Sequence, residues 1–204
     1  MSGDCCQNKS CELEQLQRQH SNVLWIVLLI NAVMFVVELV SGLRANSLSL
    51  TGDSLDMLGD ALVYGGSLVV IYKSTLAQAR VALLKGVIML ATALTVLIRG
   101  LYQLHNWTVP AAETMTQIGL LALAANLVCL FLLTRHRDDN LNMSSVWLCS
   151  RNDIIANSLV LVSALIIAIH PSPLPDILVG FFLTVVFAKS SAKVISSSCK
   201  QLIG

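Results

Sequence analysis

The sequence predicts an all-α integral membrane protein, built as a bundle of six transmembrane helices. Three observations favour this fold class. The chain of 204 residues is 55% hydrophobic and only 12% charged, whereas soluble domains average about 25% charged residues. Its mean hydropathy is +0.75. Six apolar stretches follow one another, each close to the about 20 residues that a spanning helix needs.

Turn-forming and charged residues divide these six stretches from one another. Lys and Arg gather before the first stretch, in the second and fourth connections, and after the last stretch. Because cytoplasmic loops hold an excess of these residues, both termini are expected in the cytoplasm. We expect a multi-pass protein of a bacterial inner (plasma) membrane. The predicted spans are 22–43, 48–72, 80–104, 111–134, 144–169 and 175–196.

Three regions are expected along the chain: a cytoplasmic N-terminal tail (1–21), the six-helix domain (22–198) and a short cytoplasmic end (199–204). The tail places Cys5, Cys6 and Cys11 within seven residues, with His20 nearby. These thiols either capture or deliver a metal ion, or they belong to a solvated segment without a ligand. The tail does not have the pattern of a signal peptide, which begins with a short basic region followed by an apolar one.

Three carboxylates interrupt the second predicted span. Asp53, Asp56 and Asp60 are spaced i, i+3, i+7 and therefore share one helical face. Each costs about 2.5–3.5 kcal/mol at the centre of a spanning helix. Such a set is expected where a cation lies between the carboxylates or where some of them bind protons.

The fifth predicted span repeats this spacing. Cys149, Asp153 and Asn157 follow i, i+4, i+8. If Asp56 and Asp60 face Cys149 and Asp153, the two pairs supply the four ligands that zinc prefers. Proton-relay groups and polar packing between helices are the alternatives.

Other polar residues receive secondary roles. Asp53 and Asn157 are secondary candidates as metal ligands. Asp53 is expected instead to bond locally or to line the outward path, and Asn157 to orient Asp153 or to bond another helix. Glu38 in the first span is expected to serve packing or a proton path. Asn31 and Asn126 are expected to form hydrogen bonds between helices. His105, His136 and His170 fall at helix ends or in loops, away from the central site.

The stretches "NAVMFVVELVSGLRANSLSLTGDSLDMLGD" (31–60) and "SRNDIIAN" (150–157) resemble the cation diffusion facilitators, which export divalent metals in exchange for protons. The resemblance implies that Asp56, Asp60 and Asp153 bind the transported ion. It places Cys149 where the family usually has His, and a thiolate favours softer ions such as Zn²⁺ or Cd²⁺. Typical members also have a cytoplasmic domain after the sixth helix. Since we expect none here, dimerisation would use the membrane helices.

The resulting prediction is a secondary transporter of Zn²⁺, or of Cd²⁺ or Co²⁺, without a permanently bound cofactor. The alternatives are a non-transporting membrane protein that binds or delivers metal through its tail cysteines, and a drug/proton antiporter, which the few aromatic residues disfavour. No HExxH, G-x-S-x-G or nucleotide-binding Gly-rich motif occurs, so an enzyme is not expected. A net charge of +1 gives no reason to expect nucleic acid.

Overall fold

The computed structural model describes residues 3–70, 75–135 and 143–203. Within these ranges, the side chains of 3–22, 67–70 and 143–152, and of a few residues elsewhere, are not described. The described chain forms six helices: α1 (Gly3–Arg44), α2 (Leu48–Val70), α3 (Thr75–Asn106), α4 (Ala112–Arg135), α5 (Met143–Ile169) and α6 (Leu174–Ile203). The predicted all-α fold is therefore confirmed.

The helix bounds agree with the predicted spans to within one or two residues for α2, α4 and α5. The backbone of α1 begins much earlier than predicted, at Gly3, because the stretch 11–19 is rich in the good helix formers Glu, Leu, Gln and Arg. Helix α6 likewise continues to Ile203, since no proline or glycine interrupts its last turns. The predicted region boundaries after residues 21 and 198 therefore fall inside helices α1 and α6.

Four helices contain long apolar segments that could cross a membrane, counted over the described residues. The described apolar part of α5, Asp153–Ile169, is shorter, and α2 contains three aspartates. The six predicted crossings thus stay a prediction, although the chain is a membrane protein. The four segments are Trp25–Arg44, Ala79–Asn106, Ala112–Leu133 and Leu174–Lys200.

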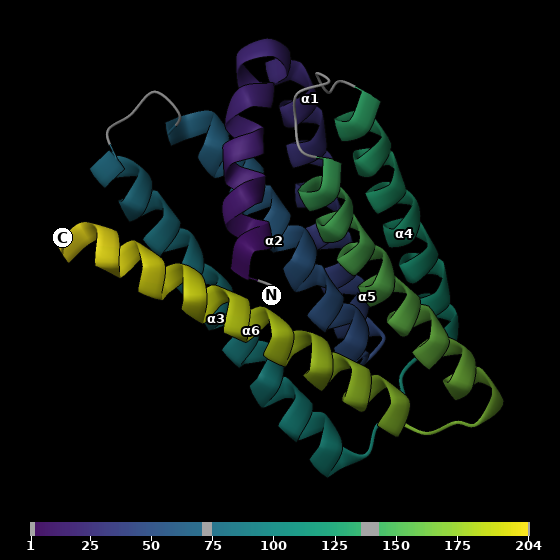
Figure 1. Ribbon diagram of the computed structural model, residues 1–204. Coiled ribbons are helices and arrows are strands. Elements are labelled where there is room, and N and C mark those ends of the chain that lie inside the picture. The colour runs from purple at the N-terminus through teal and green to yellow at the C-terminus, as the bar shows by residue number, and fades with distance from the viewer. Residues whose placement is uncertain (1–2, 71–74, 136–142, 204) are drawn as a thin grey trace.

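Three connections meet at one end of the bundle, which we call the hairpin end: 45–47, 107–111 and 170–173. The Ala111 amide donates a hydrogen bond to the Ala45 carbonyl at 3.0 Å, and Asp176 at the start of α6 contacts the start of α2. Successive helices therefore run in alternating directions. Figure 1 shows α3 and α6 on one side of α2, and α4 and α5 on the other.

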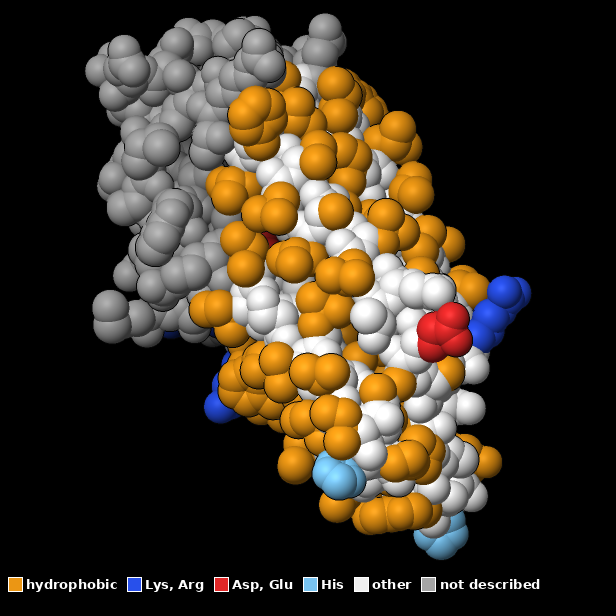
Figure 2. All heavy atoms as spheres, turned by 90° about the vertical axis from the view of Figure 1, so that its right-hand side faces the viewer, with side chains coloured by type: hydrophobic (Ala, Val, Ile, Leu, Met, Phe, Trp, Pro, Cys, Tyr) orange, Lys and Arg blue, Asp and Glu red, His pale blue; other side chains and the backbone are white. Residues whose placement is uncertain are grey.

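The outer surface is apolar and the interior contains many polar groups. Leu29, Ile98 and Leu178 are 65%, 68% and 68% exposed, whereas Glu38, Asp53 and Asn157 are buried. Figure 2 shows hydrophobic side chains spread over the face formed by α4 and α5, with the few visible charged and histidine side chains at its edges and lower end. An apolar surface of this extent is typical of a face that a membrane or another protein covers.

Small residues let α2 approach its neighbours closely near the hairpin end. A Cβ atom on Gly180 of α6 would lie 2.6 Å from the Leu48 carbonyl carbon, and one on Gly100 of α3 would lie 2.7 Å from the Leu48 side chain. Close backbone approach at glycine is typical of packed membrane helices. The first turn of α2 therefore packs closely between α3 and α6.

Candidate cation pathway

The three aspartates of α2 occupy successive depths in the bundle. Asp53, Asp56 and Asp60 lie five, eight and twelve residues after Leu48, the first residue of α2. At 1.5 Å per residue, these positions are about 8, 12 and 18 Å from the hairpin end. Asp53 is 2% exposed, and Asp56 and Asp60 are partly buried. The acidic face predicted for this helix thus lies inside the bundle.

Helix α5 brings Asp153 and Asn157 into the bundle. Asp153 is partly buried and Asn157 is 1% exposed. The Asn157 side-chain nitrogen donates to the Asp153 carbonyl oxygen at 2.9 Å, and its side-chain oxygen is buried without a hydrogen-bond partner in the described part of the chain. The observed bond therefore holds Asn157 against its own helix and does not reach the Asp153 carboxylate.

Over the residues whose side chains are described, no three His, Cys, Asp or Glu groups lie together as a metal site. Asp56, Asp60 and Asp153 are thus not gathered into one cluster here. Helix α2 packs mainly against α1 and α6, and α5 mainly against α4, so the two helices that carry the predicted ligands are not each other's main partners. The Cys149 side chain lies outside the described residues, and the four-ligand set stays a prediction.

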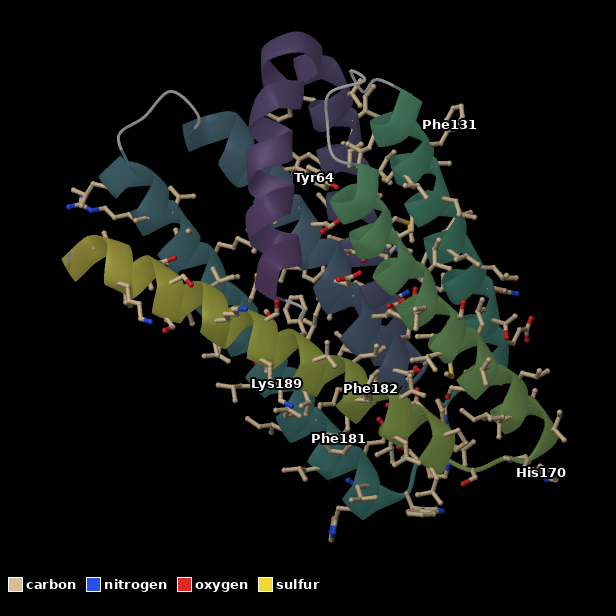
Figure 3. All side chains as sticks on the ribbon, in the orientation of Figure 1. Tyr64, Phe131, His170, Phe181, Phe182 and Lys189 are labelled. Atoms are coloured by element: carbon tan, nitrogen blue, oxygen red, sulfur yellow. The ribbon has the colours of Figure 1, made fainter. Side chains whose placement is uncertain are left out.

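The tail cysteines Cys5, Cys6 and Cys11 also have undescribed side chains, although their backbone belongs to α1. His136 falls outside the described residues altogether. His105 and His170 are exposed near the hairpin end, and Figure 3 shows His170 at the end of α5, away from the middle of the bundle. These two histidines do not approach the aspartates of α2.

Glu38 of α1 joins Asp53 to form what we call the buried acidic pair. Glu38 lies six residues before the end of α1, about 9 Å from the hairpin end, and so matches the depth of Asp53. Glu38 is 0% exposed and Asp53 is 2% exposed. The two carboxylates interact electrostatically, and Asp56 interacts with both. None of the four carboxylate oxygens has a hydrogen-bond partner within the described chain.

A third buried carboxylate, that of Asp176, has the opposite environment. Asp176 is in the first turn of α6 and is 0% exposed. Its Oδ1 accepts hydrogen bonds from the Ser47 hydroxyl at 2.7 Å and from the Ser49 hydroxyl and amide at 2.7 and 3.0 Å. Its Oδ2 accepts from the Leu48 amide at 2.6 Å and from Gln103 Nε2 at 3.0 Å. We call this network the Asp176 clasp.

The Asp176 clasp completes the N-terminus of α2. The first amides of a helix have no partner within the helix and favour negative charge. Ser47 caps one of them, because its hydroxyl oxygen accepts from the Leu50 amide at 3.1 Å. Asp176 supplies acceptors for two more from another helix. The depth of the acidic face of α2 is therefore fixed relative to α6.

Two residues of α3 extend this cross-link to the end of α1. Arg99 donates to the Leu43 carbonyl at 2.9 Å, where a cation also favours the C-terminal end of the helix. Gln103 donates to the Asn46 carbonyl at 2.7 Å.

Sequence reasoning did not single out Asp176. The available signal was the position of Asp176, two residues into a helix that follows prolines. A Ser-Leu-Ser helix start elsewhere in the chain offers donors for its carboxylate.

One further polar contact between helices was predicted and is present. Asn31 of α1 donates to Cys129 Sγ of α4 at 3.7 Å and to the Val27 carbonyl at 2.9 Å. The expected bond from Asn126 is not seen from its side-chain nitrogen, which is buried without a partner among the described residues.

Comparison with known families supports the chemistry suggested by this polar interior. A family model described as the cation efflux transmembrane domain matches residues 24–203. No curated protein matches the chain. The matched region includes all of α2 to α6 and the part of α1 that contains Glu38.

Proposed function

Because the chain belongs to the cation efflux family, and is accordingly a metal cation transporter, we propose that it exports a divalent ion in exchange for protons. Zn²⁺ is the first candidate, with Cd²⁺ and Co²⁺ next. The observation that supports this proposal is the acidic face of α2. Three aspartates at successive depths lie inside a bundle whose outer surface is apolar. Intramembrane carboxylates of this kind mark ion and proton pathways.

The proposed ligands are Asp56 and Asp60 on α2 with Cys149 and Asp153 on α5. Their assignment rests on the matching i, i+4 spacing and on the family match. A thiolate and carboxylates bind metal only after they lose their protons, so metal loading releases protons and protonation releases metal. Exchange of the two at one site is the chemistry that antiport requires. Rocking of the helices would then expose the site to each side in turn.

The membrane arrangement belongs to the same proposal. Six crossings with both termini in the cytoplasm would place the hairpin end on the outer side, and a homodimer would form through the membrane helices. The alternating helix directions are compatible with this arrangement. The ion would then enter near Asp60 and leave past Asp53.

Metal flux in proteoliposomes with an imposed pH gradient tests the proposal. Wild type is compared with Asp60→Asn and with the control Glu113→Gln, which changes an exposed carboxylate on α4. Gradient-dependent Zn²⁺ flux should be lost in Asp60→Asn and retained in Glu113→Gln. The ranking of Zn²⁺, Cd²⁺ and Co²⁺ in wild type gives the preferred ion. Stoichiometric metal binding without flux, lost when Cys5, Cys6 and Cys11 are replaced by Ser, would instead favour a binding or delivery protein.

A further inference from the structure

The buried acidic pair lies where a transported ion would pass between the α2 aspartates and the hairpin end. Glu38 and Asp53 come from adjacent antiparallel helices joined by the short turn 45–47. Asp56 lies three residues beyond Asp53, a rise of about 4.5 Å along α2. Asp56 also interacts electrostatically with both members of the pair. The pair is therefore one step along the same acidic face.

Nearby hydroxyl groups do not satisfy these carboxylates. Thr51 and Ser54 flank Asp53 in α2, yet each donates its one hydroxyl hydrogen to a backbone carbonyl: Thr51 to Ser47 at 2.6 Å, and Ser54 to Thr51 at 2.7 Å. A hydroxyl has only one hydrogen to donate. Within the described residues, the four oxygens of the pair thus have no donor and are open to a ligand.

The charge of the pair indicates what this ligand is. Burying an ionised carboxylate without a partner is strongly unfavourable. Two carboxylates carry two negative charges, and one divalent cation cancels both while occupying oxygens that otherwise have no partner. Glu38, which is fully buried and contributed by another helix, interacts electrostatically with Asp53 and Asp56 of α2.

We propose that Glu38 and Asp53 form a second cation-binding station, which holds the divalent cargo through carboxylate oxygens on its way to the hairpin end. This station rests on the proposed transport function. It differs from the inner ligand set because it contains oxygen donors only. Oxygen ligands accept hard and borderline ions such as Mn²⁺ and Zn²⁺ alike, whereas a thiolate selects softer ions. Selection would therefore occur at the inner set and not at the station.

Two protein ligands leave most of the coordination sphere to water. A site of this kind binds more weakly than a four-ligand site, and an exit station has to release its ion. The pair would hold a partly hydrated ion transiently and lower the cost of moving it away from Asp56.

Metal binding to purified full-length protein tests the station. The three tail cysteines are first replaced by Ser so that the tail does not contribute. Equilibrium dialysis with radioactive Cd²⁺ should give two ions per chain, falling to one in E38Q/D53N and to one in D60N. Mn²⁺, observed by electron paramagnetic resonance, should bind to D60N, in which the inner set is disabled, and not to E38Q/D53N/D60N.

Two controls separate this result from misfolding. Glu113→Gln should bind as many ions as the parent protein. If E38Q/D53N does not elute as a single species in detergent, Glu38→Gln alone should raise the Mn²⁺ dissociation constant by about tenfold or more, since disturbing even the support of a metal ligand costs about that much.

The outcomes that overturn the station differ from those that overturn transport. One Cd²⁺ per chain, lost in D60N and unchanged in E38Q/D53N, would mean that the pair holds protons and not metal, while the transport site remains. Cd²⁺ binding that E38Q/D53N abolishes and D60N leaves intact would support the station and remove the inner site from the transport proposal.

Discussion

The Asp176 clasp and the buried acidic pair both bury carboxylates near the same end of the bundle, but only the carboxylate of the clasp has hydrogen-bond donors around it in the described chain. Asp176 accepts five hydrogen bonds, four from residues 47–49 and one from Gln103 of α3. Glu38 and Asp53 accept none from the described chain. Donors are thus available at this end of the fold, and they are concentrated on one carboxylate. A satisfied carboxylate joins helices, whereas an unsatisfied pair is suited to a ligand that comes and goes.

The largest expected effect comes from removing the clasp. Asp176→Ala leaves two helix amides and two hydroxyl groups without their acceptor, and breaking a buried charged network typically costs about 3–5 kcal/mol. The free energy of unfolding in mixed detergent micelles should fall by about that amount. Asp176→Asn tests the geometry, because its NH₂ group would face the donors of Leu48 and Gln103.

A compensating change sharpens this prediction. With Asn at 176, Gln103→Glu supplies an acceptor opposite the new NH₂ group and should recover part of the lost stability. Gln103→Glu alone, which would set two carboxylates against each other, should destabilise. Equal unfolding free energies for wild type and Asp176→Asn would show that the clasp does not hold the helices together.

The next effect concerns the packing that brings α2 and α6 close enough for the clasp. Gly180→Ala places a methyl group 2.6 Å from the Leu48 backbone, and overpacking of this kind costs about 1–3 kcal/mol. Gly66→Ala is the matched control, because its Cβ would meet its nearest neighbour, Val81, at an ordinary 3.6 Å. Thermal unfolding should separate the two variants; similar melting temperatures would contradict the close approach.

Substitutions in the acidic pair should have the opposite effect to substitutions in the clasp. They should change the stability little and reduce transport strongly. Glu38→Gln keeps the shape of the side chain and removes a buried charge that has no hydrogen-bond partner. We expect the free energy of unfolding to change by less than about 1 kcal/mol, while metal flux in proteoliposomes falls. A loss of stability as large as that of Asp176→Ala would show that Glu38 is a structural residue and that the pair does not differ from the clasp in this respect.

The same contrast shows what could be predicted from the sequence. Helix number and most helix bounds follow from hydropathy and turn residues, and the acidic face of α2 follows from i, i+3, i+7 spacing. The clasp could not be predicted, because it joins Asp176 to residues about 128 positions earlier in the chain. The pair could have been predicted, because Glu38 and Asp53 lie at similar distances on either side of one turn; only their proximity was missed.

The proposed metal ligands are intermediate between the clasp and the pair in how far the sequence predicts them. Matching spacing predicts that Asp56 and Asp60 share a face and that Asp153 follows Cys149 by one turn. Whether the two faces meet depends on the rotation and separation of α2 and α5, which local patterns do not determine. In the described side chains the aspartates do not gather into one metal site, so the complete set awaits the ion-binding measurements.

The smallest expected effect comes from the same comparison made between neutral side chains, those of two buried asparagines. Asn31 and Asn126 are both buried, but Asn31 donates to the Val27 carbonyl and to Cys129, whereas the Asn126 side-chain nitrogen has no partner among the described residues. Hydrogen bonds between membrane helices average about 0.6 kcal/mol and reach about 1.7 kcal/mol. Asn31→Leu should therefore lower the unfolding free energy by an amount in this range. Asn126→Leu should leave it unchanged or raise it, because an unsatisfied polar group is replaced by an apolar one of similar size. Equal losses for both variants would mean that partnership within the bundle does not decide which buried polar groups stabilise it.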